Sequence, residues 1–257
     1  MTINDTNPPA RRRFEIKRLF SFLFRPRAAF QWLAGEKSAA WLTPLLCLSL
    51  TLLLVTVASG FLRARLAAMG EVNLPTDWQW WSDAMRNNYM QAMQATQSPV
   101  FLYVIPAITS LAGLWLGWGI LSGLLHLAST LMGGRGSMSS ALNIVAWASL
   151  PFALRDLLRL LFMFVARHPI ASPGLSGFVT ASGNGALFLA NLLKNVDLFF
   201  IWQVILLIMG FSLVDSLPRG KAAASVLVVL LASLLVQAGI STLLSKLGGM
   251  MVTRPFM

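Results

Sequence analysis

Charged side chains are scarce in this sequence. They make up 11% of its 257 residues, and only nine of them are acidic, whereas about a quarter of an average soluble chain is charged. Hydrophobic residues make up 56% of the chain. A soluble fold of this length cannot cover so many apolar side chains, because much of any folded surface stays exposed. The composition therefore excludes an ordinary soluble domain and predicts a polytopic membrane protein.

Residues that bind metals or form nucleophile–base pairs are also few. The chain has one cysteine, Cys47, and two histidines, His126 and His168, which lie far apart in the sequence. It contains no CxxC, HExxH or GxxxxGK[ST] motif, so zinc, metalloprotease and P-loop chemistry have no support. We therefore predict no catalytic, metal-binding or cofactor-binding residues, and we do not expect an enzyme.

The basic excess, a formal net charge of +11, has two interpretations. In a soluble protein it would suggest nucleic-acid binding, but no recognition module accompanies the charge. In a membrane protein, Lys and Arg hold the ends of spans and contact anionic headgroups. We therefore expect membrane lipids, and no nucleic acid, as partners.

Five apolar segments are long enough to cross about 30 Å of hydrocarbon. They cover residues 41–62, 100–132, 140–166, 196–214 and 222–244. The predicted fold is all-α, with a bundle of five transmembrane helices in one membrane domain, 41–247. An outer tail, 248–257, follows the stop signals Gly248 and Gly249. With the N-terminus inside, the inner segments hold eleven Lys and Arg and the outer segments seven, which favours a cytoplasmic N-terminus and an outer C-terminus.

The N-terminal region divides into a polar, disordered tail, 1–12, and a basic segment, 13–40. In the basic segment, four apolar residues share one helical face: Ile16, Leu19, Phe20 and Leu23. A basic amphipathic helix of this kind lies in the headgroup plane. We therefore expect headgroup binding by five basic residues, Arg11, Arg12, Arg13, Lys17 and Arg18. A nuclear localisation signal and a calmodulin target are less favoured alternatives.

The connection 63–99 is polar but rich in aromatic residues. Trp78, Trp81, Met85 and Tyr89 recur at helical spacing, which predicts an amphipathic helix lying on the outer face of the membrane. A lid over a ligand or partner is the alternative.

Glycine and serine separate the second and third apolar segments, in GGRGSMSSALNIVAWASLP over residues 133–151. Glycines such as Gly133 can end a helix, and Ser137 or Ser139 can cap the next one. Pro151 has no backbone N–H to donate, so we expect it to kink or divide the third helix.

The second span contains two glycine pairs at four-residue spacing, Gly113/Gly117 and Gly119/Gly123. Such small-xxx-small pairs let membrane helices approach closely. Because the pairs point to nearly opposite sides, we expect this helix to lie in the middle of the bundle and to pack against more helices than any other. The same four glycines are the predicted helix-packing or partner interface.

The third span carries Arg155, Asp156 and Arg159, and Asp197 lies at the start of the fourth. Charges inside a membrane are costly, so each is a candidate functional residue. An internal ion pair is the favoured interpretation, and a polar transport pathway or a partner interface is the alternative.

These features together resemble the bacterial Yip1-domain family of five-helix membrane proteins. GGRGSMSSALNIVAWASLP is similar to the family's GG-x-G-S/T-F…A-x-A-S-x-P pattern, with Met138 where an aromatic residue is usual. VDLFFIWQVILLIMGFSL resembles its D-x-F-x-x-W-x-x-x-L…G pattern, and SLPRGKAAA resembles its basic turn before the last span. With the basic segment around Pro26, the resemblance covers about 26–244, and it names no active site.

The resemblance implies an integral protein of the bacterial cytoplasmic membrane. Members of the family include an accessory subunit that accompanies an ABC-type exporter, and eukaryotic relatives act with small GTPases in vesicle trafficking. Our hypothesis is a non-enzymatic accessory or scaffold subunit that binds another integral membrane protein, with components of an ABC transporter as the expected partner. The alternative is a small transporter or channel with a polar pathway at Arg155, Asp156 and Arg159.

Overall fold

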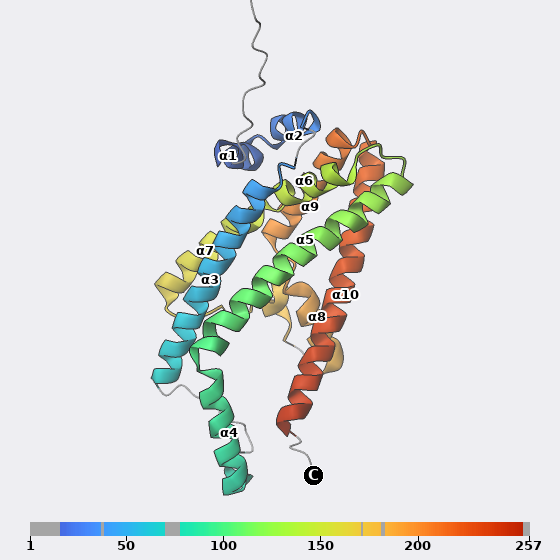
Figure 1. The fold of residues 1–257 in the computed structure, drawn as a ribbon. Coiled ribbons are helices and arrows are strands. Elements are labelled where there is room, and N and C mark those ends of the chain that lie inside the picture. The colour runs from blue at the N-terminus through green and yellow to red at the C-terminus, as the bar shows by residue number, and fades with distance from the viewer. Residues whose placement is uncertain (1–15, 37–38, 70–77, 171, 181–182, 254–257) are drawn as a thin grey trace, which may run out of the picture.

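The computed structural model describes residues 16–36, 39–69, 78–170, 172–180 and 183–253 (Figure 1). Every regular element within these ranges is helical, which confirms the all-α prediction. The helices are α1 (Ile16–Phe24), α2 (Pro26–Ala34), α3 (Leu42–Ala68), α4 (Asp83–Thr96), α5 (Ile105–Leu131), α6 (Met138–Ala148), α7 (Leu150–Ala166), α8 (Asn184–Leu193), α9 (Leu198–Val214) and α10 (Arg219–Thr253). Three short elements complete them: η1 (Trp78–Trp80), η2 (Val100–Val104) and η3 (Gly174–Phe178). The predicted disordered tail, 1–12, lies outside the described residues.

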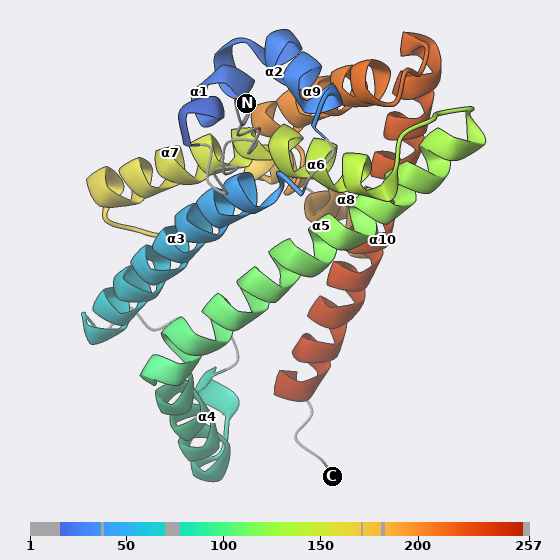
Figure 2. The same cartoon turned by 45° about the horizontal axis from the view of Figure 1, so that its top comes forward.

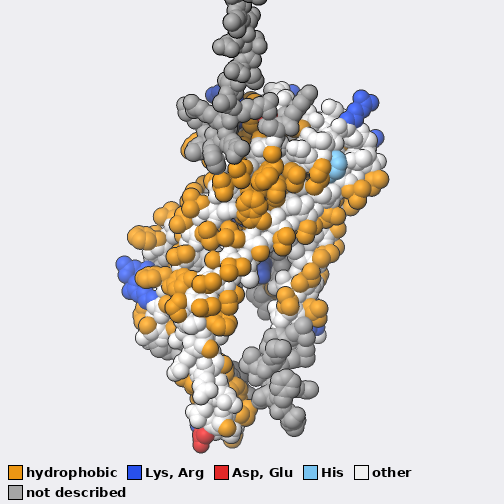
Figure 3. Space-filling model, in the orientation of Figure 1, with side chains coloured by type: hydrophobic (Ala, Val, Ile, Leu, Met, Phe, Trp, Pro, Cys, Tyr) orange, Lys and Arg blue, Asp and Glu red, His pale blue; other side chains and the backbone are white. Residues whose placement is uncertain are grey.

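Three helical stretches of the described chain are long and apolar enough to cross a membrane, namely Leu42–Ala68, Val100–Leu131 and Arg219–Lys246. Helices α8 and α9 make a fourth if the pair, bent by 59° at the break between them, counts as one span. The protein is therefore polytopic. Figure 3 agrees, since hydrophobic side chains are spread over much of the face that it shows.

The predicted third span, 140–166, is divided into α6 and α7 at Ser149, and Pro151 lies in the first turn of α7. Proline has no N–H to complete the helix of the preceding residues, so a new helix begins there. This confirms the expected division. Helix α6, with 11 residues, is too short to cross a bilayer by itself.

The predicted helix stop at Gly248 and Gly249 is wrong. Helix α10 continues through both glycines to Thr253. A glycine costs a helix only about 1 kcal/mol relative to alanine, which does not by itself end a long helix.

The hairpin between α5 and α6 follows the predicted chemistry. Gly133, with φ of 93°, takes the left-handed conformation that ends α5. The N–H of Ser140 donates to Oγ of Ser137 at 3.1 Å, so Ser137, and not Ser139, caps α6.

Helix α6 lies at the centre of the packing. Its residues from Asn143 to Ala148 are all buried, and it packs against α2, α3, α5, α7 and α9. Helix α5 packs mainly against α3, α6 and α10. The expectation that the second span contacts more helices than any other is therefore wrong, because the short α6 is enclosed by one end of the bundle whereas α5 lies along its outside (Figure 2).

The N-terminal helices dock on this same end. Phe22 of α1 is fully buried, and its ring stacks on Trp147 of α6 with 4.3 Å between centroids. Phe30 of α2 is also fully buried, beside Gly210 of α9, where a Cβ would lie 2.9 Å from Phe30 Cε1. Phe20, on the apolar face predicted from the sequence, is 65% exposed. Phe22, from outside the predicted face, therefore anchors α1 to the protein.

The aromatic connection forms a small cluster of its own. The rings of Trp78, Trp81 and Tyr89 lie 5.4–5.5 Å apart. The helix there, α4, begins only at Asp83, so the two tryptophans precede it and fold back onto Tyr89. Trp80 is 88% exposed and projects away from the described part of the chain.

Candidate functional site

Four charged side chains meet between α7 and the start of α9. Arg155 Nη1 lies 3.4 Å from Asp197 Oδ2, and Arg155 Nε lies 3.7 Å from Asp156 Oδ1. Arg159 reaches the same two carboxylates, at 3.9 Å from Asp156 and 4.0 Å from Asp197. The structure thus brings together all four residues that the sequence marked as intramembrane charges, and we call them the ion cluster.

Local structure positions each member of the ion cluster. Arg155 and Arg159 lie one helical turn apart on α7 and share a face. Asp197 caps α9 by accepting from the N–H of Phe200 through Oδ1 at 2.8 Å, which leaves Oδ2 for the arginines. On the other side, Thr51 of α3 lies beside Asp156. Thr51 is nine residues into α3, about 13 Å along its axis, so the cluster lies deep in the bundle.

The ion cluster balances its own charge. The side chains of Asp156 and Asp197 are 5% and 16% exposed, and those of Arg155 and Arg159 are 22% and 25% exposed. Enclosed charges of this kind are tolerated when each has an opposite partner. The cluster therefore joins α7 to α9 as a neutral unit, and its distances, mostly beyond 3.4 Å, are those of ion pairs and not of tight hydrogen bonds.

A second buried carboxylate lies at the end of the molecule where α5 turns into α6 and where α1 and α2 dock, which we call the hairpin end. Asp215, between α9 and α10, is 1% exposed, and its Oδ2 accepts from the hydroxyl of Ser129 at 2.7 Å. The N–H of Arg135 donates to its backbone carbonyl at 3.2 Å, and Gly136 packs directly against the carboxylate, leaving no room for a Cβ. Burial raises the pKa of Asp215, and the hydrogen bond from Ser129 and the charge of His126 oppose this shift.

Sequence reasoning missed this second carboxylate. Asp215 was not among the residues marked from the sequence, and the hairpin glycines were interpreted only as the end of a helix. The contact joins segments about 80 residues apart, and the signal that could have suggested it is the unusual density of glycine in the hairpin, since a residue without a side chain permits close approach.

The four predicted interface glycines have little around them. A Cβ at Gly113, Gly117 or Gly119 would meet no atom within 4 Å, and one at Gly123 would meet only Cε of Met138, at 3.9 Å. The close helix crossing instead uses Gly60 of α3, where a Cβ would lie 2.7 Å from the carbonyl oxygen of Leu102. Within the described chain, the interface glycines of α5 therefore mediate no close helix packing.

The predicted headgroup-binding residues are only partly visible. Arg11, Arg12 and Arg13 lie outside the described residues, and Lys17 is described through its backbone alone. The guanidinium carbon of Arg18 lies 3.8 Å from the ring centroid of Trp32, a cation–π contact that ties α1 to α2.

A chain of helices with several apolar spans and an enclosed, charge-balanced cluster defines a polytopic integral membrane protein. The family model of the Yip1 domain matches residues 20–240. The chain belongs to this family, as its hairpin and fourth-span patterns indicated. No curated protein and no solved structure matches it.

Proposed function

We propose that this Yip1-domain protein is a non-enzymatic accessory or scaffold subunit that binds another integral membrane protein through its helices. The observation that carries the proposal is the exposure of α5. None of the apolar window that qualifies Val100–Leu131 as a span is buried inside the chain, and the glycines at 113, 117 and 119 have open space beside them. Small residues in a membrane helix are positions at which a second helix can approach closely.

The course of α10 also supports a binding surface for a partner helix on the exposed side of α5. Helices α5 and α10 meet at the hairpin end and separate towards the opposite end in both views (Figures 1 and 2). Gly239, on the diverging half of α10, also has no atom within 4 Å of a would-be Cβ. A partner helix that lies along these halves would find small residues on both.

Components of an ABC-type exporter are the narrower candidate partner, and this choice is supported by the family resemblance alone. Mild-detergent purification from native membranes, followed by mass spectrometry and native sizing, tests the proposal. We expect a stoichiometric partner, and an ATPase or permease would identify the exporter. If the protein is recovered alone and monomeric, the proposal fails.

Two matched variants locate the interface. Gly113→Leu/Gly117→Leu and Gly119→Leu/Gly123→Leu each add two large side chains to α5, at positions where a Cβ meets no described atom within 4 Å except Cε of Met138 beside Gly123. We expect one pair to abolish co-purification while the protein keeps its own unfolding transition, because leucine also favours helix. Full retention of the partner by both variants would exclude the glycine faces as the interface.

The proposal includes a topology: five crossings of a bacterial cytoplasmic membrane, with the N-terminus inside and the C-terminus outside. Helix α2, the hairpin and the turn before α10 lie at one end, and the far end of α10 lies at the other (Figure 1). Arg27, Arg135 and Arg219 belong to the first end, as the positive-inside rule requires of a cytoplasmic face. A reporter that is active only in the cytoplasm should work at the N-terminus and not at the C-terminus, and activity at both ends would refute an odd number of crossings.

A small transporter or channel is the second candidate, and the ion cluster is the observation that favours it. Because the four groups compensate one another, a structural role explains them equally well. Solute or ion flux into liposomes containing the purified protein, abolished by Asp156→Asn and Arg159→Leu, would support transport. Flux no greater than that into empty liposomes would remove this candidate.

A further inference from the structure

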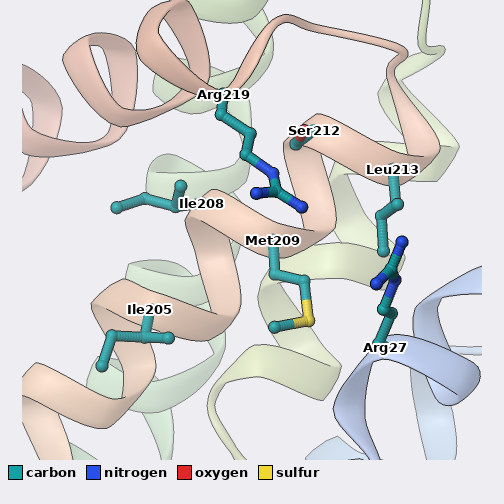
Figure 4. A pocket seen from close by; sticks show the side chains of 7 residues that line it. All are labelled: Arg27, Ile205, Ile208, Met209, Ser212, Leu213 and Arg219. Atoms are coloured by element: carbon teal, nitrogen blue, oxygen red, sulfur yellow. The ribbon is translucent and has the colours of Figure 1, made fainter.

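A small cavity opens beside α9 at the hairpin end of the molecule. Its volume is about 200 Å³, below the usual range of roughly 300–1,000 Å³ for sites that enclose a whole small molecule. Two arginines from distant parts of the sequence flank it, Arg27 on α2 and Arg219 at the start of α10. Figure 4 shows the two side chains extending from the start of α10 and from α2 towards the same part of α9, where Met209 and Leu213 lie.

Neither arginine has a carboxylate partner in the described part of the chain. No ion pair or hydrogen bond joins the guanidinium group of Arg27 or Arg219 to another described residue, and both residues are exposed. Ser212 of α9 also lines the cavity, next to Arg219. Two guanidinium groups on one cavity, unpaired within the described chain, favour an anion, and the fork of each guanidinium matches two oxygens of a phosphate.

The remaining lining residues of the cavity are mostly apolar, and three of them lie in a row along α9. Ile205, Ile208 and Met209 precede Ser212 at the spacing of one helical face, so they form a stripe along α9. The stripe runs about 10 Å from Ser212 to Ile205, away from the basic end and into the transmembrane part of the helix. Ile205 is 54% exposed. A free phosphate ion would not use this stripe, whereas an acyl chain would cover it.

We infer that this cavity binds the phosphate headgroup of an anionic membrane lipid. The guanidinium groups of Arg27 and Arg219 hold the phosphate oxygens, and an acyl chain of the same lipid lies along Met209, Ile208 and Ile205. The lipid joins α2 to the start of α10, two segments that the chain itself does not connect here by any ion pair between described residues. The site shares Arg27 with the basic segment 13–40 but includes none of the five predicted headgroup-binding residues, and none of the glycines of α5 lines it.

Native mass spectrometry of the full chain in detergent tests the site, with phosphatidylglycerol and phosphatidylcholine as probes at equal concentration. We expect wild-type protein to retain phosphatidylglycerol preferentially, one molecule per chain. Arg27→Gln/Arg219→Gln should weaken this retention by roughly thirtyfold, since each basic residue near an anionic headgroup contributes about a fivefold gain. Equal retention of the two lipids by wild-type protein would overturn the inference without any variant.

The matched control is Arg63→Gln/Arg65→Gln, which removes the same charge from exposed positions near the far end of α3. It should leave retention within twofold of wild type, and an equal loss would show that net charge, and not the cavity, is responsible. Competition with inorganic phosphate distinguishes a lipid headgroup from a free phosphate ion as the ligand. If millimolar phosphate displaces the lipid from wild-type protein, the cavity is a site for free anions and the lipid assignment is wrong.

Discussion

Replacing Asp156 by asparagine should destabilise the protein far more than its distance to Arg159 alone suggests. Asp156 lies 3.9 Å from Arg159, three residues later, with 5% of its side chain exposed. Asp83 and Arg86 have the same spacing and the same 3.9 Å separation, but the side chain of Asp83 is 97% exposed. The two pairs therefore differ in burial and in the second arginine, Arg155, that Asp156 faces, and Asp83→Asn is the exposed control with the same spacing.

The expected magnitude follows from the surroundings of Asp156. Opposite charges about 4 Å apart attract by ~4 kcal/mol at an effective dielectric constant of about 20, and Asp156 faces two arginines. The asparagine variant leaves both arginines facing Asp197 alone. Removing one partner of a buried pair typically costs about 3–5 kcal/mol, because the remaining charge is uncompensated. The exposed pair at Asp83 should contribute less than about 1 kcal/mol.

Reversible unfolding in mixed detergent micelles, followed by tryptophan fluorescence, measures both variants. We expect Asp156→Asn to lose at least ~3 kcal/mol relative to wild type. The double variant Asp156→Asn/Arg159→Gln should recover part of this loss, since it restores one arginine to one carboxylate. Equal losses for Asp156→Asn and Asp83→Asn, or a further loss in the double variant, would refute the argument that charge balance stabilises the ion cluster.

Three further predictions concern the hairpin end. Gly210→Ala should cost about 1–3 kcal/mol by overpacking, because a Cβ there would overlap α6 and α2, whereas Gly239→Ala, in open space, should change stability by less than ~1 kcal/mol in the same unfolding assay. Burial raises the pKa of Asp215 above its ordinary value of 3.8, so the unfolded state binds fewer protons and the free energy of unfolding should fall as pH rises above about 4. Asp215→Asn should flatten this pH dependence in unfolding measurements up to about pH 8, and the same slope in variant and wild type would contradict a raised pKa of Asp215. Phe22→Ala removes a fully buried ring and should lower stability by about 3 kcal/mol and expose α1 to protease, which an unchanged cleavage rate would disprove.

The features that could be predicted from the sequence are those that depend on nearby residues. The division at Pro151, the cap at Ser137 and the turn at Gly133 each follow from the backbone chemistry of a few adjacent residues. The apolar runs were visible for the same reason, because a membrane span is a local property of composition.

The features that could not be predicted depend on contacts between distant segments. Helical periodicity identified an apolar face on α1, yet Phe22, outside that face, meets Trp147 of α6. Glycine spacing marked α5, yet the close approaches use Gly60 and Gly210. Spacing shows which residues share a face, but it does not show which face another helix will cover.

The ion cluster lies between these two cases. A charge inside an apolar run is visible locally, and Arg155, Asp156 and Arg159 were marked on that basis. One oxygen of Asp197 caps α9, which sequence alone can suggest. Its other oxygen pairs with Arg155, 42 positions away in the sequence, and only the folded chain shows that contact. The balance of two acids and two bases, on which the structural interpretation depends, exists only in the folded chain.

The core and the proposed partner surface lie in different parts of the molecule, so substitutions can affect stability and partner binding separately. At the hairpin end, α1, α2, α6 and α9 bury aromatic side chains against one another, so a substitution such as Phe22→Ala should lower stability and, through it, every function. The exposed half of α5 contributes little to this core, and leucine at Gly113 and Gly117 meets no neighbour within 4 Å of its Cβ. A variant that loses the partner but keeps the wild-type unfolding free energy must therefore have lost an interface. If each substitution that releases the partner also destabilises the chain in proportion, the partner is held by the hairpin end instead, and the open surface of α5 faces only lipid.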